Sequence, residues 1–203
     1  MKPSFPKQVA RGISLRTRHV ALTVLLAMIT PLGVVRAEAP EPALPPDLAT
    51  VRSVLAKYKD PVLAVRDGYF STLGCVHYKE GGMGVHFLNP QLIGPVLDPV
   101  KPQILVYEPK GGKLQLVAAE WFVPLATGIT ERPQLFGQPF DGPMEGHEPL
   151  IPKQLHHYDL HVWLFKANPN GHFATTNPDV SCDGAYSYSL LESAPAAVAH
   201  HKQ

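Results

Sequence analysis

The sequence predicts an α+β domain, in which an N-terminal pair of helices packs on a mainly antiparallel sheet of four or more strands. Three observations support this fold class. Apolar residues recur at helical spacing between residues 47 and 67. The segments after residue 72 are short, rich in β-branched and aromatic residues, and separated by turn residues. The chain also holds 22 prolines and 16 glycines, which favours a loop-rich domain over a helical bundle.

Two helix-start signals precede the predicted sheet. Asp47 can cap a first helix, because a stripe of apolar residues at helical spacing follows it. Asp60 and Pro61 repeat the start signal, and a second helix is predicted from there to the stop at Gly68. Each helix has one apolar face, so both should lie on the sheet. The stripe of the first helix consists of Leu48, Val51, Val54, Leu55 and Tyr58.

Four segments are predicted to be strands, and two of them form a hairpin. Residues 103–107 and 114–123 flank Gly111 and Gly112, which can supply the positive φ that a hairpin turn requires. Residues 124–155 contain six prolines and no clear helix or strand pattern. Their apolar content indicates a loop that packs on the domain. The other two predicted strands are residues 82–88 and 157–166.

The N-terminal segment predicts export. Its first nineteen residues are basic with no acidic side chain, and a mostly apolar run follows from Val20 to Val35. Cleavage after Ala37 or Ala39 fits this pattern, so residues 1–37 are predicted to be a cleavable signal peptide. The alternative is a single membrane anchor, but a span needs about 20 apolar residues and this run is shorter. We therefore expect a secreted or periplasmic protein with no stable membrane span after cleavage.

The remainder of the chain is expected to form a single domain. Residues 38–46 are predicted to be a proline-rich leader, residues 47–192 the α+β domain, and residues 193–203 a flexible tail. The formal net charge of the whole sequence is +1. No nucleic-acid partner is expected, because the basic surface of a nucleic-acid binder is missing. The sequence does not define the oligomeric state.

The sequence contains two cysteines, Cys75 and Cys182. An even pair in an exported protein is predicted to form one disulfide. The bond would close a loop of about a hundred residues and hold the C-terminal segment to the rest of the domain. The alternative is that both thiolates bind a metal ion.

The last predicted strand carries two histidines on one face. Alternate side chains of a strand share a face, which leaves an apolar face for the core. His157 and His161 would lie about 13 Å apart at Cα, so only a curled or bulged strand could bring them together. Asp159 between them is either a metal ligand or the acceptor that orients an imidazole. The face with the histidines consists of His157, Asp159, His161, Trp163 and Phe165.

Glu120 lies in an otherwise apolar strand. A carboxylate in such a strand needs a partner, because an unpaired buried charge costs several kcal/mol or loses its ionisation. Arginines are scarce after the signal, where Arg52, Arg66 and Arg132 remain, and none lies in a predicted strand. This scarcity favours a metal ion or a histidine as the partner of Glu120.

His86 lies in a glycine-rich strand. Gly82 and Gly84 share its face, which would allow another backbone or a bound molecule to approach. His147, in the proline-rich loop, could reach over the same face.

Together these residues predict a metal site built from His86, Glu120, His157 and His161. Zinc is the favoured ion, and copper, iron or manganese also accept this ligand set. Asp159, His147, Trp121 and Trp163 are expected behind the ligands or around a pocket. Two alternatives stay open: a non-catalytic domain whose polar pocket binds a small molecule or peptide without metal, and purely structural histidines. The sequence does not decide whether the site is catalytic.

Known catalytic motifs give no further guidance. The chain has no Gly-x-Ser-x-Gly elbow, no His-Glu-x-x-His motif and no Gly-x-Gly-x-x-Gly loop between a strand and a helix. The strings GMGVHFLNP, DPVKPQILVYEPKGGKLQLVAAEWFVP and HYDLHVWLFKANPNG together resemble a group of uncharacterised secreted bacterial proteins. The resemblance covers most of the mature chain and implies export; it matches no named enzyme family.

Overall fold

The structure is a computed structural model that describes residues 41–148, 151–184 and 187–189. The predicted signal peptide, the first residues of the predicted leader and the predicted C-terminal tail lie outside the described residues. Among the residues described, no helix has both the length and the apolar character needed to cross a membrane.

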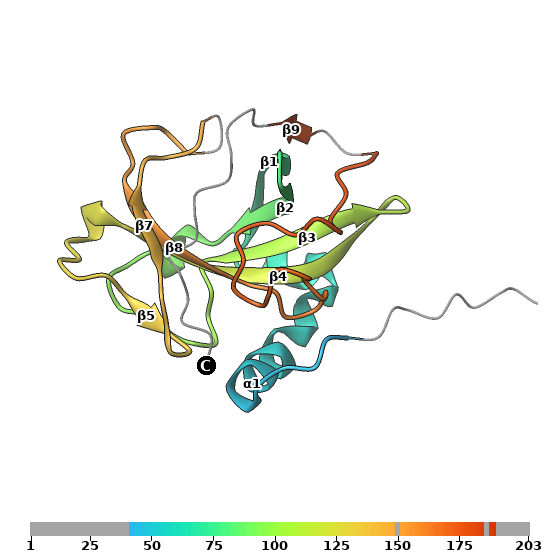
Figure 1. Ribbon diagram of the computed structural model, residues 1–203, viewed down its shortest axis with the longest axis horizontal. Coiled ribbons are helices and arrows are strands. Elements are labelled where there is room, and N and C mark those ends of the chain that lie inside the picture. Colours follow the sequence, from blue (N-terminus) through green and yellow to red (C-terminus); the bar gives the residue numbers. More distant parts are fainter. Residues whose placement is uncertain (1–40, 149–150, 185–186, 190–203) are drawn as a thin grey trace, which may run out of the picture. The chain divides into compact units, whose positions relative to one another are not determined.

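A seven-stranded sheet forms the centre of the domain, with the strand order β7-β8-β4-β3-β2-β1-β9 (Figure 1). Its neighbouring strands are antiparallel except for β1 and β9, which pair in parallel. The predicted α+β class with a mainly antiparallel sheet is therefore confirmed. The strands of this sheet are β1 (Phe70–Tyr78), β2 (Gly81–Leu88), β3 (Ile104–Lys110), β4 (Lys113–Pro124), β7 (Asp141–Met144), β8 (His157–Val162) and β9 (Ser187–Ser189). The strands β5 (Gln134–Leu135) and β6 (Gln138–Pro139) pair with each other in a second sheet.

Helices precede the sheet, as predicted. The α-helix α1 (Pro46–Leu55) continues into the 3-10 helix η1 (Ala56–Lys59), and α2 (Pro61–Arg66) follows. Asp60 caps α2, because its side chain accepts a hydrogen bond from the backbone N–H of Val62 at 3.0 Å. The described part of the chain has two more 3-10 turns, η2 (Pro90–Leu92) and η3 (Leu125–Thr127).

Two details of the first helix differ from the prediction. Asp47 is not its N-cap, because α1 begins at Pro46 and Pro45 occupies the cap position. The side chain of Asp47 accepts instead from the N–H of Leu48 in the first turn. Val54 remains 45% exposed although it belongs to the predicted apolar stripe. The buried stripe is therefore narrower than the sequence suggests.

The two faces of the sheet have separate cores. The larger core lies under the helices, where Leu48, Val51 and Leu55 of α1 pack on side chains such as Trp121 and Leu160. The opposite face has a smaller apolar cluster, which is bordered by the polar side chains considered below. This second cluster contains Ile104, Val106, Val117, Ala118, Phe122, Trp163 and Val180.

The predicted hairpin is present between β3 and β4. Gly111 and Gly112 have φ values of 58° and 73°, which suits a two-residue hairpin turn with positive φ at both positions. The register shifts by one residue between Val106 and Tyr107, where a bulge forms in β4. Beyond this bulge, Glu120 and Phe122 lie on the face opposite the helices, and Trp121 lies on the helix face.

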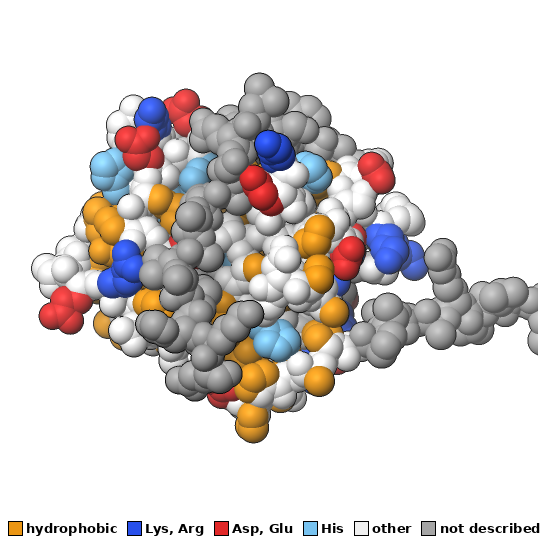
Figure 2. Space-filling view, viewed as in Figure 1, with side chains coloured by type: hydrophobic (Ala, Val, Ile, Leu, Met, Phe, Trp, Pro, Cys, Tyr) orange, Lys and Arg blue, Asp and Glu red, His pale blue; other side chains and the backbone are white. Residues whose placement is uncertain are grey.

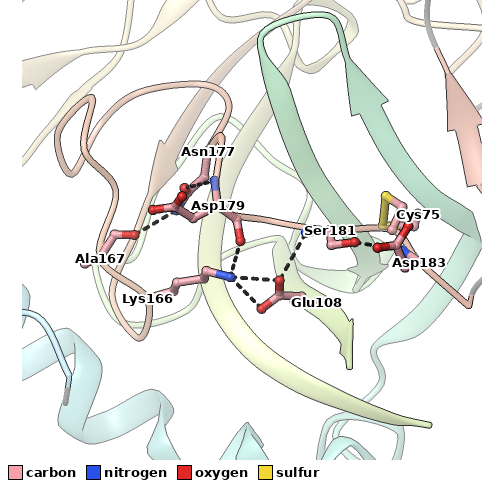
Figure 3. A network of polar contacts seen from close by, with 9 residues as sticks. Cys75, Glu108, Lys166, Ala167, Asn177, Asp179, Ser181 and Asp183 are labelled. Carbon is pink, nitrogen blue, oxygen red and sulfur yellow. Dashed lines mark hydrogen bonds and ion pairs between the residues drawn. A yellow bond between two sulfur atoms is a disulfide. The ribbon is translucent and has the colours of Figure 1, made fainter. Parts of the chain in front are cut away.

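A disulfide and a buried carboxylate help to tie the C-terminal segment to the sheet, in addition to the backbone pairing of Asn177 with Gly82 and of β9 with β1. The predicted disulfide between Cys75 and Cys182 is present, with a Cα–Cα distance of 5.5 Å. Beside it, Lys166 donates to both carboxylate oxygens of Glu108 at 2.7 and 2.8 Å (Figure 3). Glu108 also accepts from the backbone N–H of Ser181 at 3.1 Å. Since Glu108 is only 4% exposed, it acts as a buried anchor for this segment.

Replacing Glu108 with alanine is expected to lower the free energy of unfolding by about 2–3 kcal/mol, because Lys166 and the N–H of Ser181 lose a buried acceptor. Glu108→Gln keeps an acceptor oxygen and should cost about half as much. Urea denaturation of the two variants measures the difference. Equal stability of Glu108→Ala and the wild type would show that this network does not hold the segment.

Candidate metal centre

Three polar side chains from three different strands meet on the face opposite the helices. Glu120 of β4 lies directly opposite His161 of β8 in the strand register. His86 comes from β2, which is separated from β4 by β3. In a flat sheet β2 and β8 would be about 14 Å apart. The rings of His86 and His161 are nevertheless only 6.1 Å apart between centroids, so the sheet curls toward this face.

The distances within this cluster suit a metal ion. The Oε2 atom of Glu120 lies 3.2 Å from Nε2 of His161 and 3.4 Å from Nε2 of His86. Tetrahedral zinc with its usual bond lengths holds neighbouring ligand atoms about 3.3–3.5 Å apart. One possible ligand atom from each of the three residues lies within 4.8 Å of the others.

The cluster is buried and its polar atoms are incompletely satisfied. The exposed fractions of His86, Glu120 and His161 are 7%, 3% and 1%. Within the described residues, Oε2 of Glu120 and Nε2 of His161 have no partner with hydrogen-bond geometry. Buried polar atoms are almost always hydrogen-bonded in folded proteins. A cation bound between these atoms would satisfy them, whereas the apolar surroundings do not.

The other ring nitrogen of each imidazole lacks the hydrogen bond that usually orients a metal-binding histidine. The Nδ1 atoms of His86 and His161 are buried and lack a hydrogen-bond partner among the described residues. Histidines that bind metals usually donate this N–H to a carboxylate or a carbonyl. Asp159 was expected to take this role, but its Oδ2 atom faces Nε2 of His157 at 3.6 Å.

The charges of the cluster depend on one another. Burial alone raises the pKa of Glu120, but the charge of His161 and the approach of His86 outweigh it and hold this pKa well below its usual value of 4.5. Burial alone lowers the pKa of His161, but the Glu120 carboxylate outweighs it and raises the pKa to about 9. Without a metal, Glu120 and His161 therefore form a buried ion pair.

This ion pair predicts how the stability of the metal-free protein depends on pH. The raised pKa of His161 stabilises the fold fully below the usual value of 6.5, and this contribution is lost as the pH rises through about 9. The lowered pKa of Glu120 contributes above 4.5 and is lost in acid. Asp159 and Asp141, which also raise the pKa of His161, act in the same direction.

We expect zinc to reverse the alkaline part of this dependence, because zinc binds the unprotonated imidazole. The free energy of unfolding should fall between about pH 6 and about pH 9 without metal, and should rise over the same range with zinc. Denaturant titrations at both pH values, with zinc or with a chelator, test this. Identical pH profiles in the two conditions would contradict it.

The structure does not bring His157 into the cluster. It lies opposite Pro124 in the register with β4, four residues along β8 from His161. Its Nδ1 atom lies 3.2 Å from the carbonyl oxygen of Leu155, and its Nε2 atom faces Asp159. Burial lowers the pKa of His157, but the Asp159 carboxylate outweighs burial and raises it. The fourth predicted ligand thus forms a separate pair with Asp159.

A pocket of about 540 Å³ opens beside the cluster. Its polar wall includes His86 and Glu120, followed by His157 and Asp159, whereas His161 is not among the lining residues. The remaining wall is mostly apolar, and it comes from the sheet, from the segment after β2 and from the loop before β8. The apolar lining residues are Val76, Met83, Leu88, Ile93, Ile104, Phe122, Pro124, Ala126, Ile151, Pro152 and Leu155.

Of the other predicted pocket residues, His147 lines the pocket and the two tryptophans do not. The Nε2 atom of His147 contacts the sulfur of Met144 at 3.3 Å. Trp121 is fully buried on the helix face and donates its indole N–H to the carbonyl of Asp98. Trp163 is also fully buried and donates to the carbonyl of Ala174. Both tryptophans are therefore core residues.

The space directly at the two glycines near His86 is taken by neighbouring backbone. A Cβ atom at Gly84 would lie 2.6 Å from the carbonyl oxygen of Tyr107, and one at Gly82 would lie 2.6 Å from that of Val180. Of the two possibilities that the glycines allowed, the structure shows close backbone approach.

Sequence reasoning missed much of the apolar wall. Ile93, Ile151 and Leu155 line the pocket, and all three lie outside the predicted helices and strands. The signal that could have identified the last two is the apolar content of the loop at residues 124–155. That content indicated packing without showing which face the loop covers.

Comparisons with protein-family models, with curated proteins and with solved structures find no match. The fold and the site alone therefore define the class: an α+β protein with a buried His/Glu cluster that could hold a metal ion beside an apolar pocket. The disulfide suggests an oxidising compartment. Figure 2 shows acidic and basic side chains interspersed on the face drawn, in keeping with the small net charge.

Proposed function

We propose that this protein is an exported metal-binding protein that holds a divalent transition metal between His86, Glu120 and His161. The convergence of three buried ligand atoms, two of them 3.2 and 3.4 Å from the third, is the observation that carries the proposal. Export rests on the basic and apolar N-terminal pattern and agrees with the disulfide.

The ligand set favours zinc. Two imidazoles and one carboxylate with an open fourth position are typical of catalytic zinc sites. The same set with more open positions suits iron(II), and copper or manganese also accept it. The open side of the cluster would face the pocket, because His86 and Glu120 line it. His157 is then a pocket residue, and Asp159 holds its ring.

A second candidate function is a small-molecule-binding domain without metal. The observation that favours it is the pocket of about 540 Å³, whose size is typical of small-molecule sites. In this case the Glu120–His161 ion pair would serve as a fixed polar wall. The two functions differ in whether zinc stabilises the protein.

Thermal unfolding with and without zinc tests the first proposal. Zinc at a hundredfold excess over its Kd should stabilise the wild type by about 2.7 kcal/mol. Glu120→Gln should abolish most of this gain, because a neutral amide replaces the only anionic ligand of the cluster. The matched control is Glu108→Gln, since Glu108 is also a buried glutamate of this sheet but lies in the Lys166 network. An equal zinc effect in both variants would overturn the proposed site.

A further inference from the structure

The pocket has a polar side and an apolar side, and this polarity restricts what it can bind. His86 and Glu120 lie at the polar side, with the His157–Asp159 pair beside them. Met83, Ile93 and Leu155 belong to the apolar wall. A ligand that fits both sides needs a compact polar head and an apolar body.

The charge of the proposed centre determines the head. Two neutral imidazoles, one carboxylate and one divalent cation together carry a single positive charge. In a pocket whose wall is mostly apolar, a ligand with one negative charge would neutralise that excess at low dielectric. Asp159 is a second carboxylate of this wall, with Oδ1 buried and unpartnered among the described residues, but its Oδ2 atom faces Nε2 of His157 at 3.6 Å. The imidazole of His157, whose pKa Asp159 raises, can carry the positive charge that balances this carboxylate.

We infer that the pocket binds a monoanionic organic acid with an aliphatic or aromatic body, its oxygen head beside His86 and Glu120 and its body against Ile93 and Leu155. This inference rests on the proposed function, because the metal supplies the positive charge that selects the head. The volume of about 540 Å³ limits the ligand to the size of a typical small metabolite.

Straight-chain alkyl hydroxamates are suitable probes, because they present one metal-binding anionic head on a body of adjustable length. Calorimetric titration of the zinc-loaded full-length protein with butyl, hexyl and octyl hydroxamates should show affinity rising about three- to fourfold for each added methylene. The primary amide of octanoic acid, which has the body without the anionic head, should bind at least about tenfold more weakly than the octyl hydroxamate.

Two matched variants locate the body of the ligand. Ile93→Gln places an amide in the apolar wall and should flatten the dependence on chain length. Val62→Gln makes the same kind of change at an exposed residue of α2, 69% exposed and outside the pocket lining, and should leave the dependence intact.

The outcomes separate this inference from the proposed function. Zinc uptake with the same affinity for all chain lengths overturns the inference and leaves the metal site in place. Equal affinity for the amide and the hydroxamate overturns the assigned head. A chain-length effect that survives in Ile93→Gln places the body elsewhere and also overturns the inference.

Failure of the protein to bind zinc overturns the proposed function and the inference together. The comparisons of chain length and head group use the wild type, so they decide the matter even if Ile93→Gln does not fold.

Discussion

Replacing His161 with alanine is expected to lower the zinc affinity of the protein by more than about a hundredfold, which exceeds the loss caused by removing a group that only orients a ligand. His161 is 1% exposed and faces Glu120 at 3.2 Å, so no other described side chain lies in position to replace it. Competition with a chromophoric zinc chelator measures the affinity of the folded variant.

Two histidine variants serve as controls for this prediction. His172→Ala changes a histidine outside both the cluster and the pocket lining, and its zinc affinity should equal that of the wild type. His157→Ala tests whether the metal has three protein ligands or whether His157 is a fourth. We expect it to retain zinc binding within about tenfold, because His157 pairs with Asp159. A loss as large as that of His161→Ala would instead make His157 a ligand, as the sequence suggested.

Removing the disulfide is expected to lower the free energy of unfolding by about 3–4 kcal/mol. The two cysteines are separated by 107 positions in the sequence. In the chain-entropy model a loop of about 100 residues contributes up to about 4.7 kcal/mol, and measured values are often lower. The double variant Cys75→Ala with Cys182→Ala avoids placing a hydroxyl at Cys75, which is fully buried. Thermal unfolding should shift downward by about 10 °C.

Reducing agent provides the control for the disulfide. It should destabilise the wild type to the level of the double variant and should leave the double variant unchanged. If the oxidised wild type and the double variant unfold at the same temperature, the noncovalent contacts of the C-terminal segment hold it without the bond. In that case the disulfide would not contribute to stability.

Local spacing in the sequence carried most of the fold prediction. The hairpin was predictable because Gly111 and Gly112 supply the positive φ that the turn requires. The cap at Asp60 was predictable because proline at the next position starts helices. Strand order was not predictable, since hydrogen bonding between strands distant in the sequence, such as β4 and β8, leaves no local pattern.

In the candidate site, too, local spacing predicted some features, whereas contacts between distant strands were not predictable. Alternation along β8 placed His161 and Asp159 on one face, and the isolated Glu120 indicated a histidine or metal partner, which the contact with His161 bears out. The strand rise already argued against His157 as a neighbour of His161. Alternation along β4 also speaks against Trp121 as a pocket residue. Trp121 follows Glu120 directly, so its side chain must point to the opposite face of the sheet.

The prediction grouped His86 with His161 on an assumed adjacency of strands, because no spacing rule in the sequence brings these two residues together. These residues lie on strands separated by β3 and β4, and they approach only because the sheet curls. Curvature depends on bulges and on packing between distant segments, such as the shift at Val106 and the close approach of Gly84 to Tyr107. The sequence therefore predicted the three members of the cluster, and the structure separates the fourth predicted residue, His157, from them.

The metal content of the untagged protein tests the central claim most directly. Protein saturated with zinc and then separated from free metal by gel filtration should retain one zinc per chain by elemental analysis. Glu120→Gln, treated in the same way, should retain almost none. Wild-type protein that retains no more zinc than Glu120→Gln would contradict a metal site at His86, Glu120 and His161.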